Sequence, residues 1–245
     1  MAFYQQIAPY YHYIFPLQQS QVDFVKSSFS YLSQVKLLEA GCGIGLLSIA
    51  LASSHLKIVA FDLDESMLKE AQTSMQELSV TSDQLQFLHF NMLQINNVFE
   101  AESFDGVLCF GNTLVHLESK ENVLSFLLQV KKVLKPTGKV LFQILNYDML
   151  LDQQITSLPL IDNEEIRFER YYSYPLNSLL LEFKTILTIK KDQRKMVHSI
   201  PLLPLRFSDI LSLLQQAGFN KYQFYGSYAR IPFTFESDSL VVEAF

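Results

Sequence analysis

A glycine-rich turn between two apolar segments is the part of this sequence best suited to chemistry. Residues 37–45 read LLEAGCGIG and carry three glycines at alternate positions, which are Gly41, Gly43 and Gly45. Glycine lets the backbone turn tightly and lets a ligand come close to it. The next apolar segment ends on Asp62, and a carboxylate there can accept hydrogen bonds from a ribose diol. The two features together predict a site for an adenosine-type cofactor.

Polar or glycine residues also follow the other predicted strands of this region. In an open α/β sheet the ligand crevice lies beyond the carboxyl ends of the strands, so residues at those ends should meet on one rim. The ends of strands one to four carry Glu39, Asp62, Asn91 and the run Phe110-Gly111-Asn112. The dinucleotide pattern would need a further glycine where Leu46 stands, which counts against a nicotinamide oxidoreductase.

The elements that must position these residues follow from hydrophobic periodicity. Apolar strands alternate with amphipathic helices, and Asp64 and Ser119 are suitable caps for two of those helices. This alternation predicts a parallel sheet with crossover helices. The predicted strands cover residues 35–40, 57–62, 85–90, 104–110 and 140–145.

The pattern changes in the second half of the chain. From about residue 164 to 200 apolar residues recur at every second position, which predicts an antiparallel β insertion with one covered face. The basic run 190–195 reads as the exposed tip of a hairpin. A last helix over residues 208–217 is followed by strands at 219–225 and 240–245, separated by too few residues for a crossover helix. These two strands should therefore form an antiparallel pair at the edge of the sheet.

Four runs together resemble the class I S-adenosylmethionine-dependent methyltransferases. They are LLEAGCGIGLLSIALA, IVAFDLDESMLKEA, FLHFNML and FDGVLCFGNTLVHL. The resemblance covers residues 35–145 and reaches the carboxyl terminus through the last strand pair. It implies a Rossmann-like α/β fold, with a seven-stranded, mostly parallel sheet flanked by helices and an antiparallel last strand. The short runs FGNT and LNYD are further similar to small-molecule N-methyltransferases of the glycine and sarcosine type.

The resemblance also implies a division of the chain and a role for each site residue. Residues 35–150 and 201–245 would bind the cofactor, residues 151–200 would form a substrate lid, and residues 1–34 would be an aromatic segment and helix that closes over the site. Asp62 would hold the ribose. The methionine portion would face Glu39 and the backbone of Gly41, Gly43 and Phe110. The cofactor site would also include Cys42, Gly45, Gly111 and Asn112. Leu63 and Met67 would sandwich the adenine, and Asn91 and Met92 would bond it, although the family usually has Asp at position 91.

Methyl transfer from a sulfonium is an in-line displacement, so the protein mainly aligns a nucleophile and excludes water. A base is needed only when the nucleophile arrives protonated. His116 is the best candidate for that base, and Tyr11 is a candidate for contact with the reacting groups. Tyrosines of the insertion would suit a cationic amine, whereas Arg167 or Arg170 would suit a carboxylate. The same surface could instead pack on itself or on a second copy, as in a homodimer.

Bulk properties narrow the classes of function. The chain has 245 residues and a formal net charge of −6, which disfavours nucleic acid as a partner. Its two cysteines have no metal-site spacing, and no targeting or membrane segment is recognised. We therefore expect a cytoplasmic enzyme without a metal that methylates nitrogen or oxygen of a small molecule and releases S-adenosylhomocysteine. The alternatives are a nucleic-acid or protein methyltransferase and a binding module without catalysis.

Overall fold

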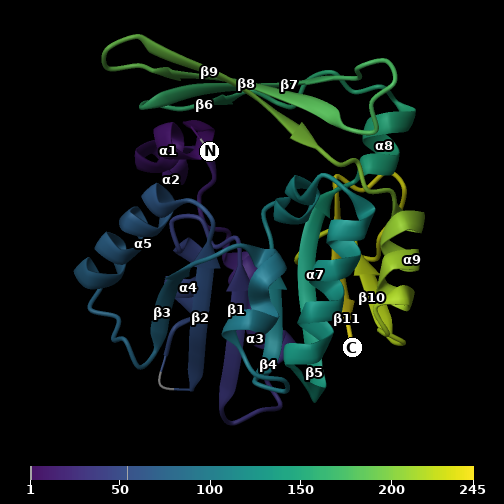
Figure 1. Ribbon diagram of the computed structural model, residues 1–245. Helices are drawn as coiled ribbons and strands as arrows, with labels where there is room; N and C mark the ends of the chain where they lie inside the picture. Colours follow the sequence, from purple (N-terminus) through teal and green to yellow (C-terminus); the bar gives the residue numbers. More distant parts are fainter. Residues whose placement is uncertain (1, 54) are drawn as a thin grey trace.

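A seven-stranded sheet forms the centre of the computed structural model, which describes residues 2–53 and 55–245 (Figure 1). Its strand order is β10-β11-β5-β4-β1-β2-β3. Strand β11 runs antiparallel to both of its neighbours, and the remaining neighbours pair in parallel. This confirms the predicted fold. The strands are β1 (Val35–Ala40), β2 (Leu56–Asp62), β3 (Leu85–His89), β4 (Phe104–Cys109), β5 (Leu134–Leu145), β10 (Tyr222–Tyr225) and β11 (Ser239–Ala244).

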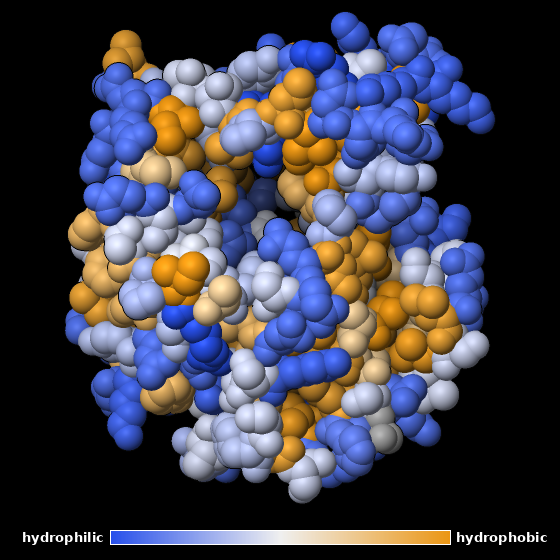
Figure 2. All heavy atoms as spheres, turned by 180° about the vertical axis from the view of Figure 1, so that it is seen from behind, coloured by the Kyte–Doolittle hydropathy of each residue, from blue (hydrophilic) through white to orange (hydrophobic). Residues whose placement is uncertain are grey.

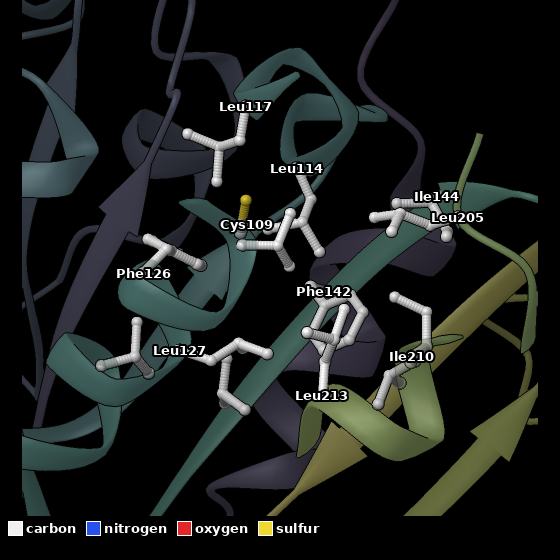
Figure 3. Close-up of a cluster of buried hydrophobic side chains, with 14 of the residues drawn as sticks. Cys109, Leu114, Leu117, Phe126, Leu127, Phe142, Ile144, Leu205, Ile210 and Leu213 are labelled. Atoms are coloured by element: carbon white, nitrogen blue, oxygen red, sulfur yellow. The ribbon is translucent and has the colours of Figure 1, made fainter. Parts of the chain in front are cut away.

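Helices cover both faces of this sheet because alternate side chains of each strand point to opposite sides. Leu37 belongs to the core under α3 (Gln19–Ser28), α4 (Leu46–Leu51) and α5 (Glu65–Glu77). Leu38 belongs to the core under α6 (Ile95–Val98), α7 (Lys120–Val133) and α9 (Phe207–Gln216). Figure 3 shows part of the second core, where the thiol of Cys109 lies among leucine and phenylalanine side chains.

The predicted helix boundaries depend on caps that the structure contains. The Asp64 side chain accepts hydrogen bonds from the backbone N–H groups of Ser66 and Met67 at the start of α5. Ser119 accepts one from Asn122 at the start of α7.

Several boundaries differ from the prediction. Apolar residues at helical spacing over residues 18–34 indicate a helix there, yet α3 ends at Ser28. Strand β10 begins at Tyr222 and not at residue 219. Strand β5 begins directly after α7, at Leu134, because its first residues already pair with β4 through a bulge.

A second, four-stranded antiparallel sheet lies above the carboxyl ends of the main strands (Figure 1). It follows α8 (Tyr147–Asp152). The basic run 190–195 lies at the tip of a hairpin as predicted, with residues 190–193 in the turn and the last two residues at the start of β9. Its strands are β6 (Ile161–Asp162), β7 (Ile166–Ser173), β8 (Leu181–Ile189) and β9 (Arg194–Leu202).

The N-terminal segment, residues 2–18, lies between the two sheets. It contains α1 (Ala2–Ile7), the short 3-10 helix η1 (Ala8–Tyr10) and α2 (Tyr11–Ile14). Three hydrogen bonds join it to the four-stranded sheet and its first loop. They link His198 Nε2 with Gln6 (3.1 Å), Arg194 with the Tyr10 hydroxyl (2.8 Å), and Asn163 with the carbonyl of Tyr13 (3.0 Å).

Candidate functional site

A cavity of about 710 Å³ separates the carboxyl ends of the main strands from the four-stranded sheet. Figure 2 shows a hollow beneath the upper layer of the molecule, with hydrophobic residues on its flanks. Eight of the residues predicted for cofactor binding or catalysis line this cavity together, whereas Gly43, Gly45 and Asp62 are not among its lining residues. The eight are Tyr11, Glu39, Gly41, Cys42, Phe110, Gly111, Asn112 and His116.

The glycine-rich turn has the backbone conformation that its sequence requires. Gly41, Gly43 and Gly45 all have φ between +55° and +73°. This is the left-handed region, which residues other than glycine rarely adopt. A Cβ atom on Gly45 would lie 2.5 Å from the ring of Phe87, and one on Gly43 would lie 3.7 Å from the ring of Tyr11. The turn is therefore a narrow cradle of backbone that Tyr11 covers.

Asp62 ties this cradle to the end of β2. Its two carboxylate oxygens accept hydrogen bonds from the backbone N–H groups of Gly43 (2.8 Å) and Asp64 (2.9 Å). Burial raises the pKa of Asp62 above its usual value, and these two bonds oppose that shift. A carboxylate has about four lone-pair sites, so two remain for the hydroxyls of a ribose.

Glu39 is the acidic group at the floor of the cavity. Its side chain is buried, and the Ser48 hydroxyl donates a hydrogen bond to it. Burial raises the pKa of Glu39 to about 7, although the bond from Ser48 lowers it in part. A ligand ammonium group nearby would favour the charged carboxylate. The residues present thus fit the amino-acid end of the expected cofactor.

The four residues predicted to bind adenine lie outside the cavity lining. Met67 is buried in a core with Phe3 and Ile7 of α1, so in this structure it serves packing. Leu63 is 42% exposed. Asn91 caps the 3-10 helix η2 (Met92–Gln94) by accepting the N–H of Leu93 at 2.9 Å, and Met92 is half-buried beside it. Leu63 follows the end of β2, and Asn91 and Met92 follow the end of the neighbouring strand β3, so these three partly exposed residues lie at the same sheet edge as Asp62.

The two predicted catalytic residues both face the cavity. His116 lies in the 3-10 helix η3 (Thr113–Leu117), and its Nε2 atom is 3.0 Å from the Tyr4 hydroxyl. Burial lowers the pKa of His116 to about 4, so its imidazole is neutral at pH 7. Burial raises the pKa of Tyr11, and Tyr11 therefore stays a neutral phenol that can donate a hydrogen bond.

Several residues that line the cavity were not predicted from the sequence. Gln143 accepts a hydrogen bond from the N–H of Gly111 at 3.1 Å and lies 3.5 Å from the Tyr228 hydroxyl. Nothing in the local pattern of β5 distinguishes Gln143, because its role depends on two distant segments. Tyr4 was part of the aromatic N-terminal run, but its pairing with His116 spans 112 positions of the chain.

Comparisons with known proteins agree with this geometry. Residues 37–138 match the family model described as a methyltransferase domain. A glycine/sarcosine N-methyltransferase from Aphanothece halophytica is 29% identical over 79% of this chain and 69% of its own length. A ubiquinone biosynthesis O-methyltransferase from Actinobacillus pleuropneumoniae serotype 7 (strain AP76) is 29% identical, and the match spans 55% of each chain.

The fold also matches a solved structure. The CcbJ methyltransferase from Streptomyces caelestis superposes with a TM-score of 0.80 at 15% identity, over 97% of this chain and 95% of that one. No helix within residues 2–53 and 55–245 is long and apolar enough to cross a bilayer. Nor does any group of three or more His, Cys, Asp or Glu side chains within these ranges form a candidate metal site.

Proposed function

We propose that this chain is a class I S-adenosylmethionine-dependent methyltransferase that moves the methyl group to a nitrogen or oxygen atom of a small molecule. The observation that carries this proposal is the cavity itself, which joins the glycine cradle and Glu39 to His116 and to the roof formed by the four-stranded sheet. Two relatives are named for small-molecule acceptors, one a nitrogen and one an oxygen methyltransferase. The net charge of −6 argues against a nucleic acid as acceptor.

Different segments of the chain would bind the cofactor and cover the acceptor, as the sequence predicts. Residues 35–150 and 201–245 would hold the cofactor, and residues 151–200 would cover the acceptor. Residues 1–34 would close the site at the side, with Tyr11 against the glycine cradle. Residues 1 and 54 lie outside the described residues. A cytoplasmic location and a homodimer stay predictions from the sequence.

In this proposal Asp62 holds the ribose, Glu39 faces the ammonium group, and the backbone of Gly41, Gly43 and Phe110 borders the carboxylate end. The adenine would lie beside the ends of β2 and β3, next to Leu63, Asn91 and Met92. When bound, S-adenosylmethionine supplies an electrophilic methyl group on a sulfonium centre. Such a reaction gains most from alignment of the acceptor and exclusion of water.

His116 is the proposed proton acceptor for an acceptor atom that arrives protonated. Its imidazole is neutral at pH 7, so one ring nitrogen can accept a proton, and this is Nδ1 when Nε2–H donates to the Tyr4 hydroxyl. The Tyr4 hydroxyl lies 3.0 Å from Nε2 and fixes the orientation of the ring. A base with a low pKa is weak, so we expect His116 to act on a proton that becomes acidic as the new bond forms.

Calorimetric titration with S-adenosylhomocysteine, run beside NAD, tests the cofactor assignment. We expect S-adenosylhomocysteine alone to bind. Replacing Asp62→Ala should weaken that binding by about 1–3 kcal/mol, because a buried charged hydrogen-bond acceptor is lost. Asp83→Ala, at an exposed position before β3, is the control and should bind normally. Binding of NAD instead, or full affinity in a folded Asp62→Ala protein, would contradict the assignment.

A further inference from the structure

The roof of the cavity contains one charged side chain. The four-stranded sheet contributes six lining residues, and five of them are apolar or phenolic. Arg170 is the exception and points to the same side of β7 as Phe168 and Tyr172, because alternate residues of a strand share a face. The lining residues of the four-stranded sheet are Ile161, Phe168, Arg170, Tyr172, Phe183 and Leu202.

Within residues 2–53 and 55–245, Arg170 differs from the other arginines in having no acidic partner. Arg167, Arg194, Arg206 and Arg230 each form an ion pair with an aspartate or glutamate. One terminal nitrogen of Arg170 donates to the carbonyl of Pro159 at 2.8 Å. Its Nε atom is buried and has no hydrogen-bond partner in the described chain. Burial lowers the pKa of Arg170, and its neighbour Tyr172 opposes that shift only in part.

Tyr172 offers a second unused donor on the same face. Its side chain is only 4% exposed, and its hydroxyl has no hydrogen-bond partner within residues 2–53 and 55–245. It lies close enough to the Tyr147 hydroxyl to perturb the pKa of that group. Asn112 donates a hydrogen bond to Tyr147 at 3.0 Å, and Asn112 itself lines the cofactor side of the cavity. This pair of unused donors therefore lies within reach of the transfer site.

We propose that Arg170 and Tyr172 bind a carboxylate group of the methyl acceptor. This proposal rests on the proposed function, since it names the chemical class of the molecule that the same cavity takes. A carboxylate presents two acceptor oxygens, which match the Nε–H of Arg170 and the hydroxyl of Tyr172. Buried donors without partners are costly, and an anion would satisfy both of them.

The surroundings favour this choice over a cationic acceptor. A positive group beside Arg170 would be repelled in a region where no carboxylate from the roof screens it. The rest of the roof is lined by Phe168, Phe183 and Leu202, which suit a hydrocarbon body attached to the carboxylate. We therefore expect an organic acid with an apolar or aromatic body.

The test measures acceptor binding separately from methyl transfer. Phenylacetate, 3-phenylpropanoate and hexanoate are titrated against the full chain saturated with S-adenosylhomocysteine, each beside its neutral amide. We expect the acids to bind more tightly than the amides. Arg170→Gln should weaken binding of the acids about tenfold to hundredfold, and Tyr172→Phe about threefold to tenfold. Neither variant should change the affinity for S-adenosylhomocysteine.

Arg167→Gln is the matched control. It lies on the same strand but is exposed and paired with Asp162 and Glu169, so acid binding should stay unchanged. Equal binding of acids and amides, absence of any binding by the acids, or full acid affinity in folded Arg170→Gln would overturn the proposal. Failure of S-adenosylhomocysteine to bind the unmodified protein would instead refute the proposed function.

Discussion

Burial moves the pKa values of two residues of the cavity in opposite directions. The pKa of His116 falls to about 4, whereas that of Glu39 rises to about 7. In both cases burial removes hydration from the charged form, and at Glu39 the Ser48 hydroxyl replaces only part of it. Both groups are therefore largely uncharged just below neutral pH, and each gives a prediction about pH dependence.

His116→Gln should slow methyl transfer and leave cofactor affinity nearly unchanged. Because the pKa of His116 is about 4, the unmodified imidazole stays neutral down to weakly acidic pH. The ratio of the transfer rates of the two proteins should thus be constant from about pH 8 to about pH 5.5 and fall toward one near pH 4. Single-turnover rates measured across this range provide the test. A ratio that declines already below pH 6.5 would indicate an imidazole of ordinary pKa.

Glu39→Gln should stabilise the protein at high pH. The folded state holds a proton on Glu39 up to about pH 7, whereas the unfolded state releases it near pH 4.5. Raising the pH through this window therefore removes stability from the unmodified protein but not from the variant. The variant should gain about 2–3 kcal/mol in free energy of unfolding between pH 4.5 and 8, relative to the unmodified protein. Urea titrations measure this gain, and the exposed Glu77→Gln should show none.

At the scale of elements, two effects can require glycine at a turn of the cofactor side, which are a positive φ and a lack of space for a Cβ atom. A pair of variants can separate them. Gly45 and Gly111 have φ of +73° and +69°, so an alanine at either place meets similar backbone strain. A Cβ on Gly45 would also collide with Phe87 and Ala71, whereas one on Gly111 meets open space. Gly45→Ala should therefore cost about 1–3 kcal/mol more than Gly111→Ala. Thermal and urea unfolding of both variants decide the matter, and equal losses would show that only backbone strain counts.

The elements were predictable wherever the signal was local. Asp64 and Ser119 marked the starts of two helices, and the alternation of strands and helices gave the sheet with its antiparallel last strand. Boundaries failed where tertiary pairing decides them. Helix α3 ends at Ser28, and Phe29 packs into the space left by Gly106 of β4. No local pattern reports such a contact.

The candidate site was also predictable where the signal is local, and it was not predictable where contacts join distant parts of the chain. Glycine spacing and strand-end residues indicated the cofactor side, and Glu39 and Asn112 do line the cavity. Met67 was expected on the apolar face of α5, but its packing against Phe3 and Ile7 of α1 is a long-range contact that no local pattern marks. The bond between Tyr4 and His116 likewise requires the N-terminal segment to cross the whole rim. Long-range pairs of this kind need the three-dimensional arrangement.

At the scale of the whole molecule, the N-terminal segment lies between the two sheets (Figure 1), and its residues Tyr4 and Tyr11 line the cavity. It packs on α5 below and bonds to β9 above. Its hydrogen bonds to the four-stranded sheet are exposed, so each contributes little stability, whereas Phe3 and Ile7 anchor it in a buried core. We expect the exposed bonds to break first when the segment moves aside and the bound cofactor leaves.

Loosening the join should therefore speed release of S-adenosylhomocysteine. The double variant Tyr10→Phe with His198→Ala removes the bonds to Arg194 and Gln6. Losing about 1 kcal/mol of closing energy should raise the dissociation rate about threefold to tenfold, while global stability changes little. Stopped-flow displacement measures the rate. Val197→Ala, which changes an exposed neighbour on the same strand, should release the ligand at the unmodified rate. If the double variant did so as well, the segment would not be the part that opens.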